Sequence, residues 1–238
     1  MTRALYRDDP YARSAETTVA AHTEAGVICA ASLFYPAGGG QPGDSGQLEW
    51  AGGAIEIVDA VKGPDDSVVL VPAQGAALPP EGAAVVQRLD WARRHAHMRV
   101  HTALHLLSVV LPLPVTGGQI GAGKGRLDFD MPEAPEDKAA LEAALAALVA
   151  RDLPVSEDWI TDEELAAQPQ MVKTMSVAPP SGQGQVRLIR IGEGADQVDL
   201  QPCGGTHVAR TGEIGALRLG KVEKKGRQNR RVTLHLAD

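Results

Sequence analysis

Hydrophobic and polar positions alternate over short distances in residues 1–90. Segments 48–61, 67–71 and 83–89 are rich in branched apolar side chains, and clusters of Gly, Pro and Asp separate them. Short apolar runs between turn residues are typical of β-strands, and no helical period interrupts them. The pattern is that of a small barrel or sandwich, and we expect residues 1–90 to form an N-terminal β-barrel domain.

From Trp91 onward the period changes to that of helices. Residues 94–111 have helical character up to Pro112, residues 135–152 are rich in Ala and Leu, and 161–164 have the spacing of a capping box. Strands are expected at 186–191, 214–222 and 230–236, with a loop at 179–184. We therefore expect residues 91–238 to form an α+β domain, with an antiparallel sheet packed against helices.

Composition narrows the class of protein only a little. The 238 residues are 44% hydrophobic and 22% charged, and their net charge of −7 gives no overall sign of a polyanionic partner. The two cysteines, Cys29 and Cys203, are too few for a disulfide framework. The N-terminus has no secretory signal, and no run approaches the roughly 20 apolar residues that span a bilayer. We expect a cytoplasmic protein.

Two pairs of residues indicate a possible metal site. His101 and His105 stand at positions i and i+4, as do Cys203 and His207. On a helix this spacing places two side chains on one face, and three imidazoles with one thiolate form a donor set that zinc prefers. The sequence predicts that all four residues bind one Zn²⁺ per chain.

Each motif also has a simpler interpretation. The two histidines could pack on a helix without metal, and Cys203 could lie in a tight glycine turn. Residues 38–43 match a dinucleotide-binding pattern and residues 118–124 match a phosphate-loop pattern. Neither is followed by the helix that such loops require, so we expect no nucleotide cofactor.

The paired motifs resemble those of a known family. His-Thr-Ala-Leu-His and Cys-Gly-Gly-Thr-His are similar to the motifs of AlaX-type alanyl-tRNA editing proteins, of the editing domain of alanyl-tRNA synthetase and of the second additional domain of threonyl-tRNA synthetase. The family's glycine-rich motif is matched by Gly39, Gly40, Gln41, Gly43, Asp44 and Gly46. Gln119 aligns with the family's active-site glutamine. The resemblance implies a free-standing editing factor of medium length.

The implied reaction is hydrolysis of the ester in seryl-tRNA(Ala), and in glycyl-tRNA(Ala), while alanyl-tRNA(Ala) is spared. An alanine-activating site rejects serine poorly, so a second site must recognise the serine hydroxyl through polar groups. Gln119, Thr102 and Thr206 are our catalytic candidates for this contact. Thr102 could instead bond back along its helix, and Thr206 could be a structural cap.

The donor set is compatible with two roles for zinc. Four protein ligands close a tetrahedral shell, which is typical of structural zinc, and His207 is the ligand whose permanent binding is least settled. Zinc could activate water for the hydrolysis or organise the binding loop. The alternative function is a non-catalytic, zinc-stabilised RNA-binding module, and a third is a zinc hydrolase of small esters.

The tRNA partner is expected to be bound through its phosphates. The candidate RNA-binding residues are the basic side chains at the start of the His helix and in a C-terminal hairpin: Arg93, Arg94, Arg99, Lys221, Lys224, Lys225, Arg227 and Arg230. A solvated basic hairpin is the simpler alternative for the second group. We expect a monomer or a weak homodimer with no membrane partner.

Overall fold

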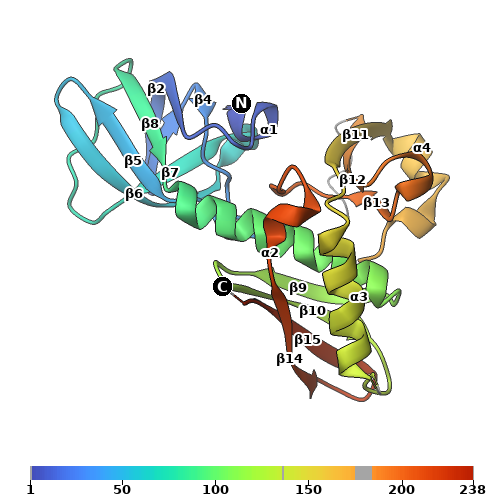
Figure 1. The fold of residues 1–238 in the computed structure, drawn as a ribbon. Coiled ribbons are helices and arrows are strands. Elements are labelled where there is room, and N and C mark those ends of the chain that lie inside the picture. The colour runs from blue at the N-terminus through green and yellow to red at the C-terminus, as the bar shows by residue number, and fades with distance from the viewer. Residues whose placement is uncertain (1, 136, 175–183, 238) are drawn as a thin grey trace. The chain divides into compact units, whose positions relative to one another are not determined.

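The structure is a computed structural model that describes residues 2–135, 137–174 and 184–237 (Figure 1). The chain divides into two compact units, Met1–His95 and Ala96–Asp238. Among the described residues, no helix combines the length and the apolar character needed to cross a membrane.

The first unit is a closed, six-stranded antiparallel barrel. Around the barrel the strands are β2 (Ser14–Thr23), β3 (Gly26–Cys29), β7 (Val68–Pro72), β6 (Gly53–Lys62), β5 (Gly46–Trp50) and β8 (Ala84–Leu89). β8 pairs with both β5 and β2 and so closes the ring. Alternate side chains fill the interior: Ile55 and Ile57 of β6 are buried, whereas Glu56 between them is exposed. The predicted barrel is confirmed.

Short elements complete this unit. β1 (Arg3–Ala4) pairs in parallel with β4 (Ala31–Ser32), α1 (Leu5–Asp8) follows β1, and a 3-10 turn, η1 (Pro64–Asp66), precedes β7. Helix α2 (Trp91–Val110) begins in this unit and continues into the second.

The second unit contains two antiparallel sheets. One has the order β14 (Leu217–Lys224), β15 (Asn229–Leu236), β10 (Lys124–Asp130) and β9 (Val115–Ile120). The other has the order β11 (Val155–Thr161), β12 (Gln185–Ile191) and β13 (Asp199–Pro202). The remaining elements are α3 (Lys138–Ala150), α4 (Asp162–Ala166), η2 (Pro169–Met171), η3 (Gly194–Asp196) and η4 (Thr211–Ile214). The predicted α+β class is confirmed.

One face of the four-stranded sheet packs on helices. A Cβ atom on Gly125 of β10 would lie 2.6 Å from Val100 Cγ1 and 2.9 Å from Leu104 Cδ1, so the glycine permits close approach of α2. Helix α3 packs against β14 (Figure 1). Since strand side chains alternate, Lys124 and Arg126 point to the opposite face of this sheet.

Several local predictions can be compared with the structure. The capping box is present, with Thr161 accepting from Glu164 N and Glu164 accepting from Thr161 N. Residues 38–43 form a turn in which Gly38 bridges Gln41, and residues 118–124 run from β9 into β10; neither opens a helix. β14 begins at Leu217 rather than at 214, because η4 occupies the preceding residues. The expected loop at 179–184 lies outside the described residues except for Gly184.

Candidate functional site

The four predicted metal ligands converge in the second unit. One donor atom from each of His101, His105, Cys203 and His207 lies within 4.8 Å of all the others. Cys203 Sγ is 3.4 Å from His101 Nε2 and 3.3 Å from His207 Nε2. The three imidazoles are 5–7% exposed. Folding therefore forms a single nitrogen–sulfur cluster from two distant segments.

Local structure explains how each pair is presented. His101 and His105 lie one turn apart on α2, so their rings share a face, with centroids 5.4 Å apart. Cys203 and His207 lie in the loop that follows β13. Arg187 of β12 holds this loop by donating from Nη1 to the carbonyls of Cys203 (2.9 Å) and Gly205 (2.8 Å), and its own carbonyl accepts from Cys203 N.

His105 is oriented by a buried carboxylate. Nδ1 of His105 is 2.9 Å from Oδ2 of Asp199, which is 3% exposed. Asp199 also accepts from Lys173 Nζ at 2.6 Å and from Gln201 Nε2 at 2.7 Å. With Nδ1 engaged in this way, Nε2 of His105 is the nitrogen presented to the cluster.

His207 is oriented by a buried hydroxyl. Thr102 Oγ1 donates to Met98 O at 2.9 Å, accepts from Val208 N at 3.3 Å and lies 3.2 Å from His207 Nδ1. Because its proton goes to Met98, the hydroxyl can only accept from an Nδ1–H of His207, which leaves Nε2 with its lone pair. Thr102 thus bonds back along its helix and also links the two ligand segments.

The groups of the cluster differ in their pKa values. Burial raises the pKa of the Cys203 thiol, but the neighbouring His101 and His207 outweigh it and hold that pKa well below its ordinary value. Burial and the charge of His101 hold the pKa of His207 well below its ordinary value. Burial lowers the pKa of His105, yet hydrogen bonds to Asp199 and Cys203 raise it to about 9 overall. A thiolate and a neutral His207 are the forms that bind metal, whereas His105 must lose its proton when a metal binds.

Two separations between donor atoms fit the spacing around a tetrahedral ion. Zn–N bonds of about 2.0–2.1 Å and Zn–S bonds of about 2.3 Å separate neighbouring ligand atoms by roughly 3.3–3.6 Å. The separations of 3.3 and 3.4 Å from Cys203 Sγ to two imidazole nitrogens agree with this spacing, and all four donor atoms lie within 4.8 Å of one another. The four residues could therefore hold a metal ion.

The structure does not place Gln119 beside the ligands, which corrects that expectation. Gln119 is exposed on β9, pairs with Arg126 across the sheet and accepts a hydrogen bond from its Nε at 3.3 Å. Both side chains lie on the sheet face opposite the one that packs on α2, because strand side chains alternate. Thr206 is 2% exposed and precedes His207 directly.

The glycine-rich motif forms a tight turn within the first unit. Gly39 and Gly40 have φ values of +58° and +83°, and a Cβ on Gly43 would lie 2.1 Å from Ala60 O. The tight turn positions the carboxylate of Asp44, which is 1% exposed. This carboxylate accepts a hydrogen bond from Tyr35 N at 2.6 Å and forms an ion pair with the guanidinium of Arg94.

Arg94 is therefore not an RNA contact, contrary to expectation. It is 0% exposed, and its other donors reach the carbonyls of Leu33 and Pro10 at 2.8 and 3.0 Å. Asp44 and these carbonyls compensate the buried charge of Arg94. Because the guanidinium is not exposed, a phosphate of RNA cannot reach it.

The other basic candidates have different environments. Arg99 donates to Ile214 O at 2.8 and 3.0 Å, and Arg93 reaches Gly43 O at 3.4 Å. Arg230 donates to Pro132 O. The exposed candidates are Lys221, Lys224, Lys225 and Arg227, on β14 and in the turn before β15. Their contact with RNA stays a prediction.

Three residues around the cluster escaped the sequence analysis: Lys173, Arg187 and Asp199. A usable signal was present at Asp199 and Gln201, which alternate on a short strand leading to Cys203 and so share one face. Lys173 and Arg187 gave no such signal, since only the folded chain brings them to the site.

The chain is similar in sequence to several known proteins. A family model described as "Threonyl and Alanyl tRNA synthetase second additional domain" matches residues 186–233, which contain Cys203 and His207. The chain is 34% identical over 249 residues to the alanyl-tRNA editing protein AlaX-M of Methanosarcina acetivorans, with 100% of both chains covered. It is 32% identical over 250 residues to AlaX-M of Methanosarcina mazei, with 100% of this chain and 98% of the relative covered.

Similarity extends to a longer class of protein. The chain is 36% identical over 233 residues to the alanine–tRNA ligase of Pyrobaculum arsenaticum, an alignment that covers 94% of this chain and 25% of the ligase. The chain thus spans about a quarter of the length of the ligases that it matches.

Proposed function

The chain belongs to the family of alanyl-tRNA editing proteins of the AlaX-M type, and from this membership we propose that it hydrolyses the ester of seryl-tRNA(Ala), and of glycyl-tRNA(Ala), while sparing alanyl-tRNA(Ala). The observation that carries the proposal is the convergence of His101, His105, Cys203 and His207 in a chain that is similar to these proteins over its full length. A single nitrogen–sulfur cluster provides a place where an ester could be positioned and cleaved.

The four ligands would hold one zinc ion. When bound, zinc supplies a positive charge that polarises the ester carbonyl. The protein's part is to fix the donors: Asp199 orients His105, Thr102 orients His207, and Arg187 holds the loop that carries Cys203. Such orientation of ligands by surrounding hydrogen bonds maintains both metal affinity and activity.

Recognition of serine requires a polar group that alanine leaves without a partner. A buried group of this kind discriminates by about 10⁴-fold or more, because its unpaired state is costly. Thr206 adjoins His207 in the sequence and is buried, and Gln119 lies on the far face of the sheet from α2. Of these two we favour Thr206, whose hydroxyl would exchange its partner within the protein for the serine hydroxyl.

The decisive experiment incubates the protein with seryl-, glycyl- and alanyl-tRNA(Ala) and measures the amino acid released. Release of serine with retention of alanine supports the proposal. No release from any of the three would reject it and favour the non-catalytic RNA-binding module, whereas cleavage of small esters without tRNA would favour a general hydrolase.

Zinc dependence is tested separately. We expect His101→Ala and Cys203→Ser to abolish zinc uptake and serine release. The matched control, His22→Ala, removes a histidine that contacts Pro79 O in the barrel unit and should leave both unchanged. Serine release at the normal rate by metal-free protein would contradict the zinc requirement.

A further inference from the structure

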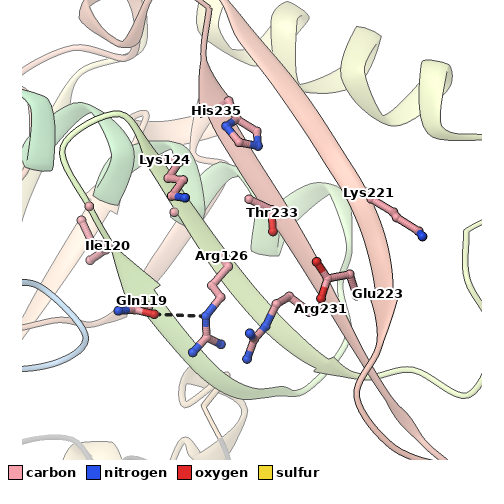
Figure 2. A pocket seen from close by; sticks show the side chains of 11 residues that line it. Gln119, Ile120, Lys124, Arg126, Lys221, Glu223, Arg231, Thr233 and His235 are labelled. Carbon is pink, nitrogen blue, oxygen red and sulfur yellow. Dashed lines mark hydrogen bonds between the residues drawn. The ribbon is translucent and has the colours of Figure 1, made fainter.

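The face of the four-stranded sheet opposite α2 carries a hollow of about 560 Å³. Its lining comes from β9, β10, β14 and β15, and includes Gln119, Lys124, Arg126, Lys221, Arg231 and His235 (Figure 2). Lys124 and Arg126 lie on this face because Gly125 between them faces α2, and His235 lies on it because its neighbour Leu234 is buried in the core.

The hollow is positively charged although the chain has a net charge of −7. Four cationic side chains line it, against one carboxylate in the lining, Glu223, and a second carboxylate, Asp128, that is paired with Arg126 and Arg231. Glu223 is itself paired with Lys225 at 2.6 Å. Lys124 and Lys221 form no ion pair among the residues that the structure describes. A local positive surface on an acidic protein favours an anionic ligand at this face.

Two arginines form a fixed floor in the hollow. Asp128 accepts from Arg231 through Nε (2.8 Å) and Nη2 (2.9 Å), and from Arg126 through Nη1 (2.6 Å). The guanidinium groups therefore lie next to one another, as Figure 2 shows. Within the described chain, Nη2 of Arg126 and Nη1 of Arg231 make no hydrogen bond. Donors held in place in this way lose little entropy when they bind an anion.

We propose that this hollow binds consecutive phosphate groups of the tRNA, with the two arginines as a fixed floor and the exposed Lys124 and Lys221 as further cations in its lining. The inference rests on the proposed function for the identity of the RNA. The lining contains no Phe, Tyr or Trp on which bases could stack. Recognition here is therefore of the backbone and independent of sequence.

The test measures the binding of uncharged tRNA(Ala) at several salt concentrations for the wild type, Lys124→Ala and Lys221→Ala. Each phosphate contact removed should lower the slope of log affinity against log salt by about one, and weaken binding about fivefold at moderate salt. The matched control is Lys138→Ala, which removes an exposed lysine from α3 in the same unit. Thermal melting checks that all three variants are folded.

Unchanged slopes in Lys124→Ala and Lys221→Ala, or an equal loss in Lys138→Ala, would overturn the inference. Failure of this inference can be distinguished from failure of the proposed function. Normal tRNA binding by both hollow variants with intact serine release would reject only the hollow. Loss of binding in these variants from a protein that releases no serine would reject only the hydrolysis.

Discussion

Asp199 Oδ2 lies 2.9 Å from Nδ1 of His105, inside the protein and away from the four donor atoms that His105 helps to gather. Lys173 and Gln201 hold the same carboxylate at 2.6 and 2.7 Å. The ring of His105 is therefore fixed by a carboxylate that does not itself belong to the cluster. A carboxylate behind a ligating histidine fixes both the tautomer and the direction of the ring.

We predict that Asp199→Asn weakens zinc binding by about 10- to 100-fold, because an amide holds the imidazole less strongly than a carboxylate does. Competition with a chromophoric chelator measures this affinity without reference to activity. Asp196→Asn, at an exposed carboxylate, is the control. Equal zinc affinity in the wild type and Asp199→Asn would show that His105 needs no such partner.

A second prediction concerns the barrel unit. Arg94→Met should lower the free energy of unfolding by about 3–5 kcal/mol, because it leaves the buried carboxylate of Asp44 uncompensated. Urea denaturation measures the loss. The neighbouring change Arg93→Met removes only a long contact to Gly43 O and should cost far less. Similar losses in the two variants would refute the assigned role of the buried pair.

A third prediction concerns acid pH. Partial burial raises the pKa of Asp128, but hydrogen bonds from Arg231 and Arg126 outweigh it and hold the pKa below its ordinary value. The stabilisation is therefore complete above the unfolded pKa of about 3.9 and is lost as the pH falls through the folded value. Asp128→Asn should cost about 1–2 kcal/mol at pH 7 and less near pH 3.

Denaturation at the two pH values measures that difference. Glu24→Gln removes an exposed negative charge and serves as the control, with little effect at either pH. A cost for Asp128→Asn that stays constant down to pH 3 would mean that the arginines do not depend on the ionised carboxylate.

A fourth prediction uses the two cysteines. Cys29 is 1% exposed, and burial raises its pKa to about 12. In Cys203→Ser protein the remaining thiol should react with a thiol reagent only as fast as the barrel opens, since the thiolate is the reactive form. The rate is compared in native buffer and in urea. Rapid native labelling would show that Cys29 is accessible.

The sequence predicted those features that depend on local spacing. His101 and His105 could be paired from the helical period, and the capping box at Thr161 from a four-residue pattern. The barrel followed from short apolar runs between turns. Each of these patterns lies within a few neighbouring residues, so it can be recognised without knowledge of the tertiary structure.

Features that depend on register or burial were not predictable in the same way. Arg94 follows Arg93 in a basic segment, and only the folded chain shows that the side chain of Arg94 is buried against Asp44 while that of Arg93 is partly exposed. The resemblance to the family's active-site glutamine predicts Gln119 beside the ligands, but the alternation of side chains along β9 directs it to the other face of the sheet. A shift of one residue in strand register moves a side chain from one face of the sheet to the other.

The hydroxyl of Thr102 has a consequence for assembly of the site. Thr102, Asp199 and Arg187 hold the ligand segments through hydrogen bonds between protein groups. We therefore expect folding to position the ligands without a bound metal ion. Small zinc fingers, in contrast, unfold when the metal is withdrawn. This protein should stay folded through a cycle of stripping and refilling, and a spectroscopically visible ion such as Co²⁺ could then report on the site directly.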